Sequence, residues 1–184
     1  MIVGNKAKFA VELLFDEFYD NNFIASGAYR IFLNGFPYGY EYPYSTLYGG
    51  IVFGLKNLLT ENIMRKNFFH KYSDYEIAVN YQKATYEDSD NDAIGKTYLG
   101  IDKKNFINSF FDLRDYSESA FDDGSFMLLF RNEAFVKLIG FQMTIETREI
   151  INVNSIIMSR KKFDNIIKRT LKTILSERSK NKKK

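Results

Sequence analysis

The chain has 184 residues, the usual size of one domain, and its lack of cysteine excludes disulfide bonds, thiolate catalysis and thiolate metal sites. Its formal net charge of +3 is unevenly distributed, because residues 159–184 carry eleven Lys and Arg against two acidic residues, which leaves the preceding part acidic. The first residues lack the features of a signal peptide, and no apolar run approaches the roughly 20 residues of a membrane span, so we expect a cytoplasmic protein.

The N-terminal part predicts an antiparallel β-hairpin unit. Apolar residues alternate with others at period two from Lys8 to Asp16, and a second strand is expected over residues 23–33. Asn34-Gly35 follows, and this dipeptide between apolar and aromatic runs predicts a tight hairpin turn, because both residues tolerate positive φ. The return strand contains Pro37 and Pro43, which have no amide hydrogen to donate, so it is expected at the edge of the sheet.

A central helix is predicted over residues 47–60, where apolar residues recur at helical spacing after a Ser45 or Thr46 cap. Alternation over residues 75–86 predicts a further strand. Between Glu87 and Asp123 the composition becomes acidic, with ten acidic residues against four basic ones. There we expect a short helix over 103–111 and otherwise exposed loop.

The C-terminal part predicts strands followed by an amphipathic helix. The expected strands begin at Ser125 and cover residues 134–146 and 150–158, with a turn at Asn132-Glu133. Ser159 is a suitable N-cap for the helix. Its apolar stripe consists of Phe163, Ile166, Ile167, Leu171, Ile174 and Leu175.

These elements predict an α+β fold. It would combine antiparallel sheets, an N-terminal β-hairpin unit, a central helix and a packed C-terminal helix. We expect one globular domain over residues 1–178, and a basic tail over 179–184 that is too polar to pack and therefore disordered.

Three partial motifs fail on inspection. Gly95-Lys96-Thr97 resembles the end of a phosphate-binding loop, but Asp90 stands where that loop needs its first glycine. Asp88, Asp90 and Asp92 have the spacing of a calcium loop, but the required glycine and the final glutamate are missing. His70 is the single histidine, so a multi-histidine metal site is excluded and no catalytic triad is recognisable. We therefore predict no catalysis, no cofactor and no metal.

Several segments resemble the immunity protein 42 family of bacterial polymorphic toxin systems. They are residues 2–12, the hairpin segment 29–35, the helix entry 45–47, the strand pair 134–158 and the helix segment 163–167. The resemblance implies a small cytoplasmic protein that binds and neutralises a cognate toxin domain. The family supplies no catalytic residues to assign to this chain.

The acidic stretch is the predicted contact surface for such a partner, because acidic loops would be steered to the basic cleft of a toxin that acts on nucleic acid. The predicted residues are Glu87, Asp88, Asp90, Asp92, Asp112, Asp115, Glu118, Asp122 and Asp123. If these residues do not form the interface, the next candidates are the edge-strand tyrosines Tyr38, Tyr40 and Tyr42.

Two other classes of function remain open. One is a nucleic-acid-binding or regulatory module that uses the basic C-terminal end, although this end lacks the interleaved aromatic residues that would stack on bases. The other is a small enzyme with a site built from loop carboxylates. No membrane association is expected.

Overall fold

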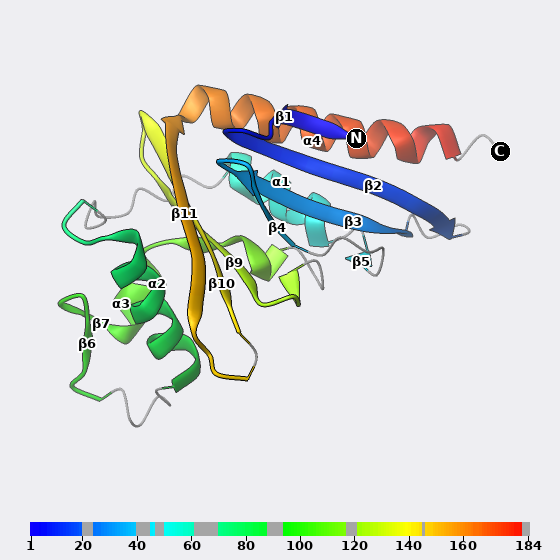
Figure 1. The fold of residues 1–184 in the computed structure, drawn as a ribbon. Coiled ribbons are helices and arrows are strands. Elements are labelled where there is room, and N and C mark those ends of the chain that lie inside the picture. Colours follow the sequence, from blue (N-terminus) through cyan, green and yellow to red (C-terminus); the bar gives the residue numbers. More distant parts are fainter. Residues whose placement is uncertain are drawn as a thin grey trace.

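The computed structural model describes residues 1–19, 24–39, 45–46, 50–60, 70–87, 94–116, 121–144 and 146–181 (Figure 1). Its N-terminal sheet has five antiparallel strands in the order β1-β2-β3-β4, with β5 also paired to β3. The strands are β1 Ile2–Asn5, β2 Phe9–Tyr19, β3 Ile24–Leu33, β4 Phe36–Tyr38 and β5 Ser45–Thr46. The predicted hairpin is confirmed, and β4 lies at the edge of the sheet as its proline indicated.

The turn between β3 and β4 has the backbone that the sequence predicts. Asn34 and Gly35 adopt φ angles of 50° and 89°, the left-handed conformation that a two-residue hairpin turn requires. The Asn34 side chain also donates a hydrogen bond of 2.8 Å to the Ser155 carbonyl, which links this turn to the second sheet. Ser45 and Thr46, predicted as helix caps, instead pair with β3 because their backbone extends the sheet.

The second sheet has four antiparallel strands in the order β11-β10-β9-β8. They are β8 Phe111–Asp112, β9 Ser125–Arg131, β10 Phe135–Met143 and β11 Ile150–Ser159. The three longer strands agree with the prediction to within a few residues. Every residue of β9 is buried, because the two faces of this sheet border two different hydrophobic clusters.

The two clusters divide the molecule into halves that share the second sheet. One cluster joins Leu129 and Leu138 to the N-terminal sheet, to α1 (Gly50–Thr60) and to α4 (Arg160–Asn181). The other joins Phe126 and Phe141 to α2 (Asp74–Gln82) and α3 (Lys103–Ile107) on the opposite face. The predicted central helix is confirmed from Gly50 onward, and residues 47–49 lie outside the described residues.

The predicted strand over residues 75–86 is wrong. This segment forms α2, followed by a π-helical turn over Lys83–Glu87. Ser73 and Glu76 make a reciprocal capping box at the start of α2, which fixes a helix there. The buried residues Ile77, Ala78 and Tyr81 then fall on one helical face, so the tertiary contact overrides the apparent alternation.

The acidic middle of the chain contains more structure than expected. The predicted helix over 103–111 is confirmed but shorter, because α3 ends at Ile107. A small two-stranded sheet (β6 Thr97–Tyr98, β7 Ile101–Asp102) precedes it, and a 3₁₀ turn over Leu113–Tyr116 follows β8. Leu113, in the expected exposed loop, is instead buried. Phe110 and Phe111 are buried as well, and these apolar side chains close the two clusters.

The C-terminal helix α4 is confirmed and lies along the N-terminal sheet (Figure 1). Ser159 caps it by accepting a hydrogen bond of 3.3 Å from the Lys162 amide. Phe163 is buried against Phe9, with ring centroids 5.6 Å apart. The helix continues to Asn181, so the first residues of the expected disordered tail are helical. Among the helices described, none is both long enough and apolar enough to cross a membrane.

Candidate functional site

The structure describes only part of the predicted acidic surface. Glu87 and Asp122 are exposed, and Glu87 accepts a hydrogen bond of 2.7 Å from Gln82. Asp123 is half-buried and accepts hydrogen bonds of 3.0 Å from the amide and the hydroxyl of Ser125. Four other predicted residues, Asp88, Asp90, Asp92 and Glu118, lie outside the described residues, as does the side chain of Asp115.

Asp112 does not lie on the exposed acidic surface, because it is only 7% exposed. It accepts hydrogen bonds from the Tyr81 hydroxyl and from the Arg114 amide, and the Arg114 guanidinium lies 3.5 Å from its carboxylate. Burial, and then the charge of Asp112, raise the pKa of Tyr81, which therefore stays protonated and continues to donate. Asp112 thus anchors α2 to β8 inside the protein.

The acidic residues that remain gather at one end of the β10–β11 hairpin. Glu87 follows Tyr86, whose carbonyl accepts a hydrogen bond of 3.4 Å from Arg148 in the hairpin turn. Asp122 and Asp123 precede Gly124, whose carbonyl accepts one of 2.8 Å from Met143 at the end of β10. The turn itself adds two exposed acids, Glu146 and Glu149. We call the set Glu87, Asp122, Asp123, Glu146 and Glu149 the acidic end.

Tyr38 is not an exposed anchor either. It is fully buried, and its ring contacts Gly140 of β10. Its hydroxyl donates a hydrogen bond of 2.6 Å to the Asn152 carbonyl and accepts one of 3.0 Å from the Asn154 side chain. Burial raises the pKa of Tyr38 to about 12, which keeps the hydroxyl protonated. Tyr40 and Tyr42 lie outside the described residues.

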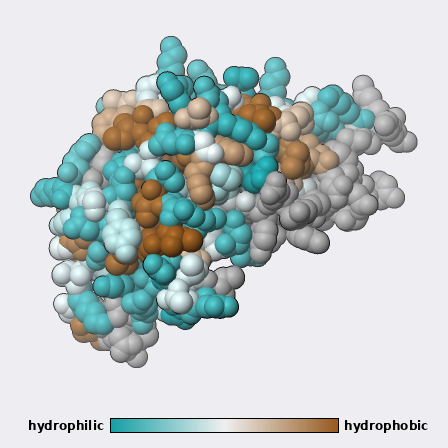
Figure 2. Space-filling model, viewed as in Figure 1, coloured by the Kyte–Doolittle hydropathy of each residue, from teal (hydrophilic) through white to brown (hydrophobic). Residues whose placement is uncertain are grey.

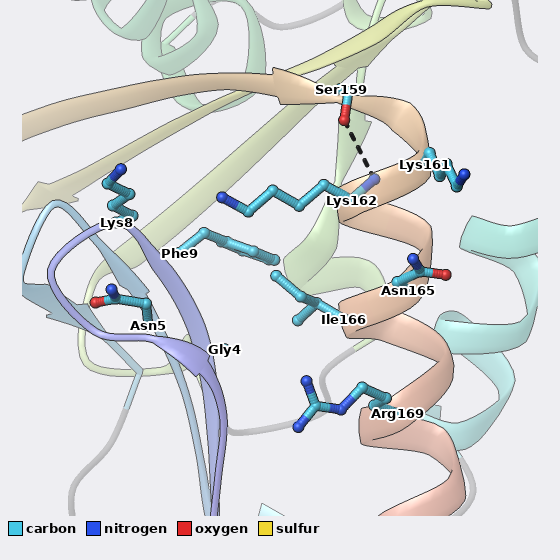
Figure 3. A pocket seen from close by; sticks show the side chains of 10 residues that line it. All are labelled: Gly4, Asn5, Lys8, Phe9, Ser159, Lys161, Lys162, Asn165, Ile166 and Arg169. Carbon is cyan, nitrogen blue, oxygen red and sulfur yellow. Dashed lines mark hydrogen bonds between the residues drawn. The ribbon is translucent and has the colours of Figure 1, made fainter.

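A cleft of about 430 Å³ opens at the other end of β11, between the β1–β2 turn and the start of α4 (Figure 3). The residues that line it are Gly4, Asn5, Lys8, Phe9, Ser159, Lys161, Lys162, Asn165, Ile166 and Arg169. Phe9 and Ile166 face each other at its floor, while Lys162 and Arg169 reach from α4 toward the hairpin that carries Lys8 (Figure 3). We call this site the basic cleft.

The cations of the basic cleft are not neutralised by neighbouring carboxylates. Within the described ranges, no ion pair involves Lys8, Lys161, Lys162 or Arg169, and no acidic residue lines the cleft. Lys161 and Lys162 also lie in the first turn of α4, where the helix dipole favours negative charge and opposes positive charge. The arrangement therefore produces a local positive potential that an anionic ligand would relieve.

Neither region has the geometry of an active site. Ser159 accepts the capping hydrogen bond from Lys162, and His70 contacts the Phe135 ring with centroids 6.1 Å apart. The described residues contain no cluster of three or more His, Cys, Asp or Glu that could hold a metal. What the two regions offer is charge of opposite sign, suited to recognition of a charged partner.

Two exposed isoleucines lie on β11 between the two charged regions. Ile151 and Ile157 of β11 are 37% and 55% exposed, and Figure 2 shows hydrophobic side chains along this strand surrounded by hydrophilic ones. Since β11 has ten residues at about 3.3 Å each, the acidic end and the basic cleft lie roughly 30 Å apart.

The basic cleft was not predicted from the sequence. Its two walls come from residues 4–9 and 159–169, which only the packing of α4 on the N-terminal sheet brings together. One signal was present in the sequence. Arg160, Lys161 and Lys162 follow the N-cap Ser159, where acidic residues would favour helix formation.

Comparisons with known proteins show the family and the fold of this chain. The family model described as Immunity protein 42 matches residues 1–173. A solved structure, the crystal structure of CdiI from Burkholderia dolosa AUO158, is 19% identical, with a TM-score of 0.60 over 94% of this chain and 99% of that chain. At this identity the likeness shows a shared fold. A search of curated proteins gives no match.

Proposed function

Since the chain belongs to the immunity protein 42 family of polymorphic toxin systems, we propose that it neutralises its toxin in the cytoplasm by direct binding through the acidic end. As an immunity protein it acts by recognition and not by catalysis. The family match leaves the particular toxin open, so the partner must be inferred from the chemistry of the surface.

The observation that carries this proposal is the convergence of acidic side chains at one end of the β10–β11 hairpin. Segments around residues 87, 122 and 146 contribute to it, and Arg148 is the basic residue of the same turn. A surface of this kind favours a toxin domain with a basic binding cleft, as a toxin that acts on nucleic acid would have. The immunity protein would then cover the cleft that the toxin uses for its substrate.

Charge neutralisation at the acidic end tests this proposal. Steering by exposed charges raises the association rate and weakens with salt. Asp122→Asn together with Asp123→Asn should therefore slow association with the toxin domain of the adjacent gene at low salt and flatten its salt dependence. Adding Glu146→Gln and Glu149→Gln should slow association further and weaken its salt dependence further. Stopped-flow measurements from about 0.05 to 0.5 M salt provide the readout.

A control is Glu133→Gln, which removes one exposed acid from the β9–β10 turn at the other end of the same sheet. It should leave the association rate within about two-fold of the wild type, as expected for a charge outside the steering region. If the four substitutions at the acidic end leave the association rate, the affinity and the protection of cells intact, the acidic end is not the contact surface.

The basic cleft favours a second candidate function, a nucleic-acid-binding or regulatory module. Such a protein would bind a short DNA duplex, with an affinity that falls steeply as salt rises. Co-purification decides between the two functions. Stoichiometric recovery of the adjacent toxin supports immunity by direct binding, whereas recovery of nucleic acid without toxin contradicts it.

A further inference from the structure

We propose that the basic cleft is a second toxin contact, and that it receives an acidic segment of the toxin with carboxylates on either side of an apolar residue. This inference rests on the proposed function, because it assumes that the chain binds a toxin directly. It assigns a distinct surface, at the opposite end of β11 from the acidic end, and a distinct chemistry for the partner.

The spacing of the groups on α4 defines the shape of the segment. Lys162, Ile166 and Arg169 are separated by four and three residues, so they share one face of the helix. At 1.5 Å per residue, the backbone positions of Lys162 and Arg169 lie about 10 Å apart. In an extended chain every second side chain lies on the same face, so two carboxylates four residues apart lie about 13 Å from each other, with one side chain between them on that face. The long side chains of Lys162 and Arg169 can reach both carboxylates while the side chain between them rests on the apolar floor.

The opposite wall completes the site. Lys8 lies on the β1–β2 turn, toward which Lys162 extends (Figure 3). The Asn5 side chain holds this turn by accepting a hydrogen bond of 2.9 Å from the Ala7 amide. Gly4 permits the tight approach of the two strands, because a Cβ there would lie 2.4 Å from the Phe9 carbonyl oxygen. The wall is thus a fixed turn, so binding needs to order the side chain of Lys8 but not its backbone.

The charges of the cleft are retained against the local preference of the helix. Cations in the first turn oppose the helix dipole, and within the described chain Lys161 and Lys162 have no carboxylate to offset this. Positions that break a local rule without compensation within the fold are expected at functional sites. A carboxylate from a partner would supply the compensation.

A protein segment fits the cleft better than nucleic acid does. Phe9 is the single aromatic residue among those that line it, so the cleft has no series of rings on which successive bases could stack. A cleft of about 430 Å³ also has the size of a pocket for a short segment. Ile151 and Ile157 are exposed on β11 between this contact and the acidic end.

The experiment compares two double variants with the same change in net charge. Lys162→Glu/Arg169→Glu reverses two charges of the cleft. Lys104→Glu/Lys172→Glu reverses two exposed charges that do not line it. Each is titrated against a catalytically inactive form of the toxin domain encoded by the adjacent gene, with the dissociation constant and the dissociation rate as readouts. The cleft variant should bind roughly ten-fold more weakly or worse, mainly through faster dissociation, and the control within about three-fold of the wild type. Thermal unfolding should show that the cleft variant is folded.

A second measurement locates the contact directly. A carbodiimide joins amines to carboxylates that touch, so treatment of the wild-type complex should link Lys8 or Lys162 to an Asp or Glu of the toxin. If the wild type and the cleft variant bind the toxin with equal affinity and no such link forms, this inference is overturned. The proposed function would still stand. If the cleft variant loses binding to a DNA duplex but keeps its affinity for the toxin, the cleft is a nucleic-acid site and the inference is also overturned. Failure of the wild type to bind the toxin would remove both proposals.

Discussion

Replacing Lys162 by glutamate should make the protein more stable. Lys162 occupies the third position of α4, three residues after the N-cap Ser159, and it is exposed. A cation near the positive end of a helix costs about 0.3–1 kcal/mol and an anion there gains a similar amount. A glutamate at this position would also complete a capping box of the kind that Ser73 and Glu76 make at α2.

The expected gain is therefore about 1 kcal/mol in the free energy of unfolding. For a chain of 184 residues this corresponds to a rise of about 2–4 °C in the melting temperature. Differential scanning calorimetry at low salt measures it directly. Because the interaction is electrostatic, the gain should shrink as salt is raised to about 1 M, where the screening length falls to roughly 3 Å.

Lys172→Glu is the matched control, because Lys172 is exposed on the same helix but lies away from both ends. It should leave the melting temperature nearly unchanged. If Lys162→Glu lowers the melting temperature, or raises it no more than Lys172→Glu does, the argument that Lys162 opposes the fold is refuted. A stabilised variant that also binds the toxin less well would show that this lysine serves recognition.

Three further substitutions test the description of the interior. Ile167→Ala should cost about 2–5 kcal/mol, because Ile167 is 1% exposed in the cluster that joins α4 to both sheets, and chemical denaturation would measure this. Gly140→Ala should cost about 1–3 kcal/mol, because the new methyl would lie 2.6 Å from the Tyr38 ring, and a smaller side chain at position 38 should relieve the clash in a double-mutant cycle. Burial raises the pKa of Glu12, but hydrogen bonds from Lys6 and Arg30 outweigh it, so this pKa lies below its ordinary value of 4.5. The contribution of Glu12 to stability is then present above pH 4.5 and is lost as pH falls through the lowered pKa. Glu12→Gln should therefore be less stable than the wild type near neutral pH, and its free energy of unfolding should change less with pH in acid. Parallel curves of unfolding free energy against pH for the two proteins would contradict this.

The fold was largely predictable where local signals and tertiary contacts agree. Asn34-Gly35 specifies its turn, and the stripe on α4 specifies the face that the helix buries. Residues 75–86 were wrongly predicted as a strand because the apolar and aromatic residues Tyr75, Ile77, Val79 and Tyr81 alternate with other residues. The Ser73-Glu76 capping box, which marks a helix start, was also present in the sequence. The capping signal is the more specific of the two, because it satisfies backbone amides that a helix start leaves unpaired.

The candidate site was less predictable because charge in a sequence does not reveal pairing. In the sequence, Asp112 cannot be told apart from the other acidic residues of the acidic stretch. In the structure it lies in the interior, where Tyr81 and Arg114 bind it. The basic cleft requires Lys8 and Lys162 to come together across most of the chain, which follows from the contact of α4 with β1 and β2 and from no local pattern. Asp122, by contrast, is exposed as expected.

The contact of α4 with the first two strands has a consequence during protein synthesis. Residues 160–181 cover the N-terminal sheet, so β1 and β2 emerge from the ribosome long before the helix that buries Phe9. The N-terminal half cannot complete its core until residues 160–181 have been translated. A prematurely terminated chain would expose apolar strands and be open to proteolysis and aggregation. In the cell, only copies that include α4 would then accumulate in folded form, so protection would depend on the supply of chains translated beyond this helix.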